Sequence, residues 1–218
     1  MFKGAGTALI TPFKDNGEVD YELFEKILDH QLENNIDALI VLGTTGESPT
    51  VHLEEREKMT KLAVEKSDGE VPVIVGTGTN DTVKVIEMNE LAEKNGADGL
   101  LIVTPYYNKT SQAGLVDHYT HIAAQTELPI IAYNVPSRTG VNIEPETFKQ
   151  MAEMEDNITA IKEASGDMSQ ILNVIEIARA NKTILSGNDD QALPLMLCGG
   201  SGVISVFSNL MPGVMKKI

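Results

Sequence analysis

Short hydrophobic runs recur along this chain, and longer segments with a helical repeat of hydrophobic residues separate them. A short, continuous apolar run is typical of a strand that is buried on both faces, as in parallel sheets. The runs lie at residues 6–10, 38–42, 73–76, 99–103, 130–134, 158–162, 183–186 and 202–205. Their alternation with helical segments along the whole chain predicts parallel β/α units.

The helical segments lie between these runs, at residues 21–34, 53–65, 82–95, 113–125, 145–154, 168–180 and 189–197. In the first of them, Phe24 is followed at three- and four-residue spacing by Ile27 and Leu28. This spacing puts the apolar side chains on one side of the helix, and we expect that side to pack against the sheet.

The even spacing of the predicted strands, without a linker or a break in composition, favours a closed (β/α)8 TIM barrel. An open, doubly wound sheet is the alternative, because the order of strands cannot be read from the pattern. We expect a single barrel domain over residues 1–218. A complete barrel takes ~250 residues, and residues 207–218 hold only the approach to an eighth helix. The barrel is therefore expected to be truncated within or before helix 8 and to lack a C-terminal helical region.

Composition narrows the choice of partners. Hydrophobic residues make up 42% of the chain, which suits a globular core, and 17 basic residues against 32 acidic ones give a formal net charge of −15. Such a charge repels phosphate backbones and anionic lipids, so we expect neither a nucleic-acid nor a membrane partner. The single cysteine, Cys198, cannot form an internal disulfide, and no signal segment is recognisable. We expect a cytoplasmic protein.

Lys162 stands at the end of the sixth apolar run, where a charged side chain is unusual. Burial disfavours the ammonium form, so the pKa should fall and leave neutral amine, as a Schiff-base nucleophile requires. The ordinary alternative is that Lys162 reaches solvent or pairs with a carboxylate such as Glu163.

Other groups that could bind or transfer protons also follow predicted strands. In a barrel the carboxyl ends of the strands converge on one cavity. Thr44 and Thr45 lie in a glycine-flanked loop suited to holding a carboxylate. Tyr133 ends the fifth strand and would meet Lys162 as a proton shuttle, and Arg138 could bind a carboxylate in bidentate fashion. Taken singly, these residues could equally be a turn, a core tyrosine and a surface arginine.

Three other patterns do not lead to a site. His118 and His121 form the one close histidine pair, and they lie on an amphipathic helix, so we expect no metal site. The segment Gly76-Thr77-Gly78 lacks the third glycine of a dinucleotide-binding loop. The segment Asn188-Asp189-Asp190 precedes a predicted helix, and we interpret its acidic residues as a helix cap rather than a cation site.

Together, the motifs after the strands resemble the 4-hydroxy-tetrahydrodipicolinate synthase family, also called dihydrodipicolinate synthases. The resemblance covers essentially the whole chain and rests on Gly43-Thr44-Thr45-Gly46-Glu47-Ser48, Thr104-Pro105-Tyr106-Tyr107-Asn108, Tyr133-Asn134-Val135-Pro136-Ser137-Arg138-Thr139-Gly140, Ile161-Lys162-Glu163-Ala164 and Gly202-Val203-Ile204-Ser205. It implies a (β/α)8 lyase of the pyruvate-dependent class I aldolase type. Such enzymes condense pyruvate with L-aspartate 4-semialdehyde in the diaminopimelate route of lysine biosynthesis.

The resemblance also implies catalytic roles. Lys162 would form an imine with pyruvate, so that no separate cofactor is needed, and Tyr133 would act as general acid and base. Thr44 and Tyr107 would complete a proton relay, with Tyr107 supplied by a neighbouring subunit of a homo-oligomer, a dimer or a tetramer.

Three further residues would bind the substrates. By the same resemblance, Thr45 would hold the pyruvate carboxylate and Ile204 would contact pyruvate through its backbone. Arg138 would receive the carboxylate of the semialdehyde.

The chain departs from family members that lysine inhibits. Their allosteric pocket combines equivalents of Ser48, Asn80 and Tyr106, which are present here, with histidines and a glutamate. At the matching positions this chain has Leu53, Arg56 and Lys84. Because two cations would repel a lysine ammonium group, we expect weak or absent inhibition by lysine.

Two other functions remain open at this stage. Another pyruvate-dependent class I aldolase, such as an N-acetylneuraminate lyase or a keto-deoxy sugar acid aldolase, would share Lys162 and Tyr133, although Arg138 and the tyrosines at 106 and 107 argue against it. A truncated form with impaired or no catalysis is the second, because missing helices would expose the apolar surface of a barrel.

Overall fold

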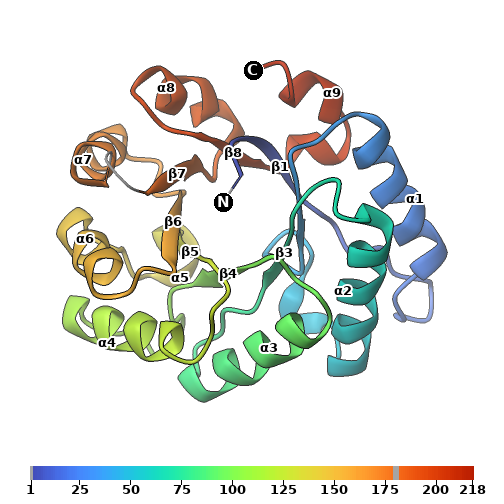
Figure 1. The fold of residues 1–218 in the computed structure, drawn as a ribbon, viewed down its shortest axis with the longest axis horizontal. Coiled ribbons are helices and arrows are strands. Elements are labelled where there is room, and N and C mark those ends of the chain that lie inside the picture. The colour runs from blue at the N-terminus through green and yellow to red at the C-terminus, as the bar shows by residue number, and fades with distance from the viewer. Residues whose placement is uncertain (1, 179–181) are drawn as a thin grey trace.

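The computed structural model describes residues 2–178 and 182–218, and its centre is a barrel of parallel strands (Figure 1). The strands are β1 (Gly4–Ala8), β2 (Ala38–Val41), β3 (Val73–Gly76), β4 (Gly99–Val103), β5 (Ile130–Asn134), β6 (Ile158–Glu163), β7 (Thr183–Ser186) and β8 (Gly202–Ser205). Each strand pairs with the next in sequence, and β8 pairs with β1 to close the barrel. The predicted (β/α)8 barrel is therefore confirmed over the open sheet.

Helices surround the barrel in chain order (Figure 1). The described α-helices are α1 (Tyr21–Glu33), α2 (Leu53–Ser67), α3 (Thr82–Lys94), α4 (Gln112–Ala123), α5 (Pro136–Thr139), α6 (Pro145–Met154), α7 (Met168–Ala178), α8 (Ala192–Leu197) and α9 (Pro212–Met215). Short 3-10 helices, η1 (Ser48–Thr50), η2 (Asp189–Gln191) and η3 (Phe207–Asn209), lie in loops. Among the described residues, no helix is long and apolar enough to cross a bilayer.

Most predicted strands and helices have the observed bounds to within two residues. The helix predicted at 189–197 is divided between η2 and α8, and positions 179 and 180 of the helix predicted at 168–180 lie outside the described residues. Residues 207–218 contain η3 and the four-residue α9, in keeping with the predicted approach to a further helix. Arg138 lies on the one-turn helix α5, which opens at Pro136 and was not among the predicted helices.

The first strand begins two residues earlier than predicted, because its partner is the last strand. Gly4 pairs with Gly202, and a Cβ placed on Gly202 would fall on the Gly4 carbonyl group. Glycine at position 202 therefore lets β8 approach β1 closely enough to close the barrel.

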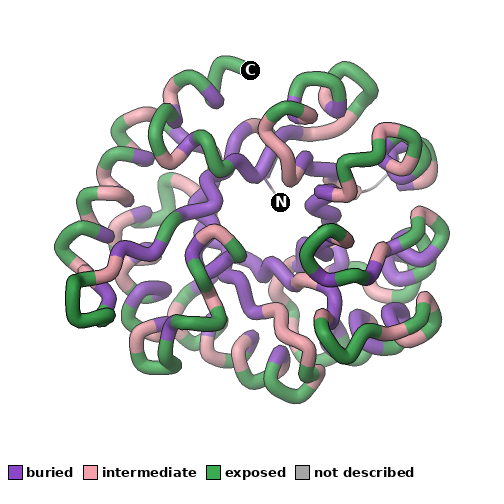
Figure 2. The backbone as a smooth tube through the Cα atoms, turned by 180° about the vertical axis from the view of Figure 1, so that it is seen from behind, coloured by how far each residue is buried: buried purple, intermediate pink, exposed green. Residues whose placement is uncertain are grey.

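The core has two layers separated by the barrel wall. Alternate strand residues such as Ile131 and Tyr133 point into the barrel, whereas Ile130 and Ala132 pack against the helices. Figure 2 shows the buried residues on the central strands and the exposed ones on the outer sides of the helices. Because the strands are buried on both faces, they appear in the sequence as continuous apolar runs.

Candidate active site

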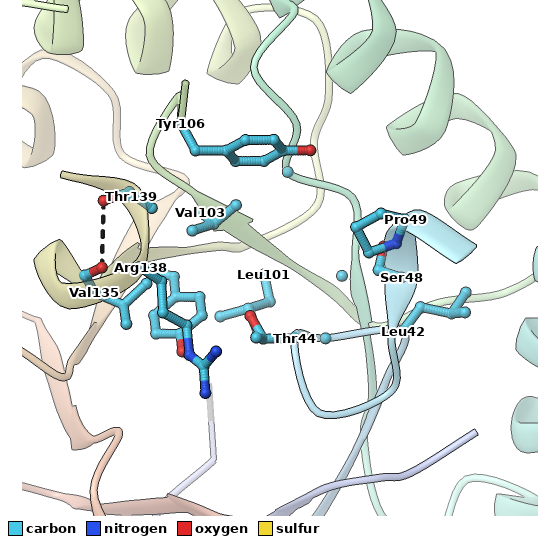
Figure 3. Close-up of a pocket in the computed structure, with 14 residues that line it drawn as sticks. Leu42, Thr44, Ser48, Pro49, Leu101, Val103, Tyr106, Val135, Arg138 and Thr139 are labelled. Carbon is cyan, nitrogen blue, oxygen red and sulfur yellow. Dashed lines mark hydrogen bonds between the residues drawn. The ribbon is translucent and has the colours of Figure 1, made fainter. Parts of the chain in front are cut away.

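A cavity of about 270 Å³ opens at the carboxyl ends of the strands, where barrel active sites lie. Its lining comes from the ends of β2 to β5 and the loops that follow them: Leu42, Gly43, Thr44, Ser48, Pro49, Gly76, Gly78, Leu101, Val103, Tyr106, Tyr133, Val135, Arg138 and Thr139. In Figure 3, Arg138 extends from α5 towards the space that Thr44 borders, and Tyr106 lies across that space. A cavity of this size suits a small molecule rather than a dinucleotide.

The loop after β2 carries both threonines of the predicted site, and their side chains differ in exposure. Thr44 is exposed and lines the cavity, whereas Thr45 is half-buried and does not line it. The loop is a tight turn, in which the Gly46 N–H donates to the Gly43 carbonyl at 3.1 Å. Thr11 fixes its far side by donating to the Gly46 carbonyl at 2.6 Å.

Lys162 and Tyr133 meet as the sequence predicted. They are directly paired in the register of β6 and β5, and Lys162 Nζ lies 4.2 Å from the centre of the Tyr133 ring. Lys162 is only 4% exposed, and its stem passes so close to Gly187 that a Cβ there would lie 3.0 Å from Lys162 Cε. Lys162 does not itself line the cavity, but Tyr133, whose ring it contacts, does.

Burial shifts the acid–base properties of this pair. It lowers the pKa of Lys162 to about 8, with the positive charge of Arg138 acting in the same direction and the carboxylate of Asp189 against it. Burial also raises the pKa of Tyr133, while hydrogen bonding with Thr44 and the charge of Arg138 act in the opposite direction. Near neutral pH the site therefore holds a phenol that can donate a proton and an amine that is partly neutral.

Arg138 is carried by α5, which is anchored at its far end. The Thr139 hydroxyl donates to the Val135 carbonyl at 3.3 Å, drawn as a dashed line in Figure 3, and to the Val141 carbonyl at 3.0 Å. Thr139 is buried, whereas Arg138 is exposed at the cavity. The guanidinium can thus meet an anion that enters from solvent.

Besides Thr45 and Lys162, two further predicted residues do not line the cavity. Ile204 is fully buried on β8 within the inner core and does not line the cavity. Tyr107 is 90% exposed at a left-handed backbone position, and its neighbour Tyr106 lines the cavity instead. The relay role of Tyr107 in a neighbouring subunit stays a prediction.

Asp189 is a residue that the sequence interpretation missed. Its assignment as a helix cap was wrong, because neither η2 nor α8 has a side-chain cap. The carboxylate turns instead to the segment after β8, where Oδ2 accepts from the N–H groups of Val206 and Phe207 at 3.1 and 3.0 Å. Asp189 thereby brings a negative charge near Lys162. Asp189 follows the end of β7 closely, and this position in the sequence could have indicated that its carboxylate lies near the site.

The histidine pair is not arranged as a metal site. His118 is 6% exposed and its Nδ1 lies 2.9 Å from the Thr82 hydroxyl oxygen. Within residues 2–178 and 182–218, no cluster of three or more histidine, cysteine, aspartate or glutamate side chains could hold a metal ion.

Comparison with known proteins places this barrel in a family. The sequence model of the Dihydrodipicolinate synthetase family matches residues 1–218. The chain belongs to this family. A relative from Alkaliphilus oremlandii, named 4-hydroxy-tetrahydrodipicolinate synthase, is 55% identical over 218 residues, which are 100% of this chain and 74% of the relative.

Solved structures of dihydrodipicolinate synthases have the same fold. One from Thermotoga maritima is 51% identical with a TM-score of 0.97, over 100% of this chain and 74% of that one. Another, described as a monomeric dihydrodipicolinate synthase variant, is 51% identical with a TM-score of 0.97, over 99% of this chain and 73% of its own. The chain thus spans about three quarters of the length of these family members.

A second, more open cavity lies beside the first, and its lining includes Ser48, Asn80 and Tyr106, which the sequence resemblance assigned to an allosteric pocket. Arg56 lines it and is only 9% exposed. Its guanidinium donates to the carbonyl and hydroxyl oxygens of Ser48 at 2.8 and 2.7 Å, and to the Gly76 carbonyl at 2.8 Å. Arg56 therefore ties the loop after β2 to the end of β3 and places a buried cation in the wall of this cavity.

Proposed function

We propose that this chain condenses pyruvate with L-aspartate 4-semialdehyde to 4-hydroxy-tetrahydrodipicolinate through a Schiff base on Lys162. Family membership supports the reaction class, and one observation supports the chemistry. The buried amine of Lys162, with a pKa of about 8, lies 4.2 Å from the ring of Tyr133 beside a small cavity. The same membership favours this reaction over that of an N-acetylneuraminate lyase-like aldolase.

The reaction begins when neutral Lys162 attacks the keto carbon of pyruvate. The resulting carbinolamine loses water to become an imine, and Tyr133 gives and takes the protons that these steps require. Loss of a methyl proton converts the imine to an enamine, whose carbon attacks the aldehyde of the second substrate. The amine of that substrate then displaces Lys162 as the ring closes, so the enzyme leaves the cycle unchanged and needs no separate cofactor.

The remaining site residues bind the substrates and relay protons in this proposal. Arg138, exposed at the cavity, receives the carboxylate of the semialdehyde. Thr45 and the backbone of Ile204 hold pyruvate, and Thr44 passes protons from Tyr133 towards solvent. Tyr107, exposed outside its own cavity, completes the relay in a neighbouring subunit of a cytoplasmic homo-oligomer.

Borohydride reduction in the presence of pyruvate tests this function. We expect a pyruvyl adduct on the peptide that contains Lys162, and none in a Lys162→Ala variant. Turnover is then measured with aspartate semialdehyde and, in parallel, with sugar-acid substrates. An adduct on another residue, no adduct, or turnover with sugar acids alone would overturn the proposal.

A further inference from the structure

Glu163, the residue after Lys162, has a fully buried carboxylate on the opposite face of β6. Because strand side chains alternate, Lys162 points into the barrel and Glu163 points outward. The carboxylate accepts hydrogen bonds from Asn134 Nδ2 at 3.0 and 3.2 Å, from Gln170 Nε2 at 3.1 Å and from the Ser165 N–H at 2.7 Å. A buried charge is thus held by neutral donors from β5, α7 and the loop after β6.

The amide donors cannot reverse their orientation without losing other hydrogen bonds. Asn134 Oδ1 accepts from the Ile143 N–H at 2.9 Å, and Asn134 Nδ2 also donates to Asn142 Oδ1 at 2.9 Å. Gln170 Nε2 donates to the same Asn142 oxygen at 2.9 Å. Both Glu163 oxygens therefore face N–H groups. All of these donors find an acceptor only when the side chain at position 163 carries two acceptor oxygens, as a carboxylate does.

The network lies one residue beyond the Lys162–Tyr133 pair. In the register of β5 and β6, Tyr133 pairs with Lys162 and Asn134 pairs with Glu163. The same two strands carry a register shift between Ile130 and Ile131. The pairing of the residues before this shift therefore does not determine the pairing of the residues after it. A shift of one residue would turn Lys162 away from the barrel interior.

We propose that Glu163 is a positioning residue for Lys162. Through Asn134 and Gln170, its carboxylate holds the carboxyl end of β6 in the register that presents Lys162 to Tyr133. The role rests on the proposed function, because it acts on the amine that attacks pyruvate.

The test compares Glu163→Gln with Glu146→Gln, the same change at a glutamate on α6 whose side chain is 76% exposed. Glu163→Gln keeps the shape of the side chain but turns an NH2 group towards donors that need an acceptor. For each protein, borohydride trapping gives the fraction of chains that form the pyruvyl adduct at Lys162. The rate of imine formation per competent chain is then followed against pyruvate concentration.

We expect Glu163→Gln to lower the saturating rate per competent chain by about tenfold or more, because the reacting groups lose their alignment. The pyruvate concentration at half-saturation should stay within about twofold, since the predicted carboxylate loop follows β2, and Glu146→Gln should match the wild type. A purely structural role would lower the trapped fraction and leave the rate per competent chain unchanged, and that result overturns the proposal.

If Glu163→Gln does not fold, the Gln170→Ala variant is tested instead, because it removes one of the donors to Glu163 from a half-buried position. A rate per competent chain several-fold below the wild type supports the positioning role, and the wild-type rate overturns it. Absence of an adduct in the wild-type protein would instead defeat the proposed function. An adduct in the wild type with an unchanged variant rate removes only the role of Glu163.

Discussion

Lys162 Nζ lies over the ring of Tyr133, 4.2 Å from its centre, on directly paired positions of two neighbouring strands. Contact with the ring face favours the ammonium form, whereas burial favours the neutral amine. Burial lowers the pKa of Lys162 from 10.5 to about 8.

The rate of imine formation should depend on pH through Lys162. Below pH 8 most of the amine is protonated, so the rate at low pyruvate concentration should fall about tenfold for each unit of pH. Above pH 8 it should level off. Tyr133→Phe keeps the ring, so the midpoint of the pH dependence should stay near pH 8. The variant loses the hydroxyl, and its turnover should be about 10²- to 10⁴-fold slower. A Phe variant with turnover within tenfold of the wild type would contradict the proton-transfer role.

Asp189→Asn should move this pH profile to lower pH. The negative charge of Asp189 raises the pKa of Lys162, and removing it destabilises the ammonium form. Asparagine can still accept from the N–H groups of Val206 and Phe207 through its side-chain oxygen. Asp190→Asn, at an exposed neighbouring position, is the matched control and should leave the midpoint in place. A midpoint that rises or stays constant in Asp189→Asn would show that Asp189 does not act on Lys162.

The sequence contained enough to predict the barrel and the pairing of Lys162 with Tyr133. Buried parallel strands must be apolar on both faces, and the carboxyl ends of neighbouring strands lie together, so residues at two such ends meet. The alternation of strand side chains could also have excluded an ion pair between Lys162 and Glu163, because neighbouring residues on a strand face opposite ways.

What could not be predicted depends on contacts between distant parts of the chain. Gly4 begins β1 because it pairs with Gly202, and Asp189 faces the backbone after β8 rather than its own helix. Neither partner is visible in a local pattern. The four-residue helix α5 is too short for a helical repeat, so its support of Arg138 was also missed.

Lysine should inhibit this enzyme weakly or not at all. Arg56 lines the second cavity with its donors bound to Ser48 and Gly76, and Lys84 adds a further cation to the cavity wall. A lysine ammonium group would be repelled there by both cations, and Asp81 is the one carboxylate among the residues that line the cavity. Turnover is measured with low-millimolar L-lysine, with D-lysine at the same concentration as a control for ionic strength. Half-inhibition by L-lysine in this range would refute the prediction.

Acid should destabilise the fold through His118. Burial lowers its pKa from 6.5 to about 4, with the positive charge of His121 acting in the same direction. Between these pH values the unfolded chain binds a proton that the folded chain does not, so stability falls as the pH drops from 6.5 to 4 and this contribution then levels off. The full loss would be ~3 kcal/mol. Urea unfolding of His118→Gln between pH 4 and 7 should give a flatter dependence than the wild type.

The control for this prediction is His30→Gln, because His30 is exposed on α1. It should keep the pH dependence of the wild type, whereas His118→Gln should lose much of the slope between pH 6.5 and 4. The substitution also removes the contact with Thr82, so the variant can be less stable at pH 7 and still be less sensitive to acid. The change in slope, and not the change in stability at one pH, therefore measures the titration of His118. Equal slopes in His118→Gln and the wild type would show that other groups cause the acid sensitivity.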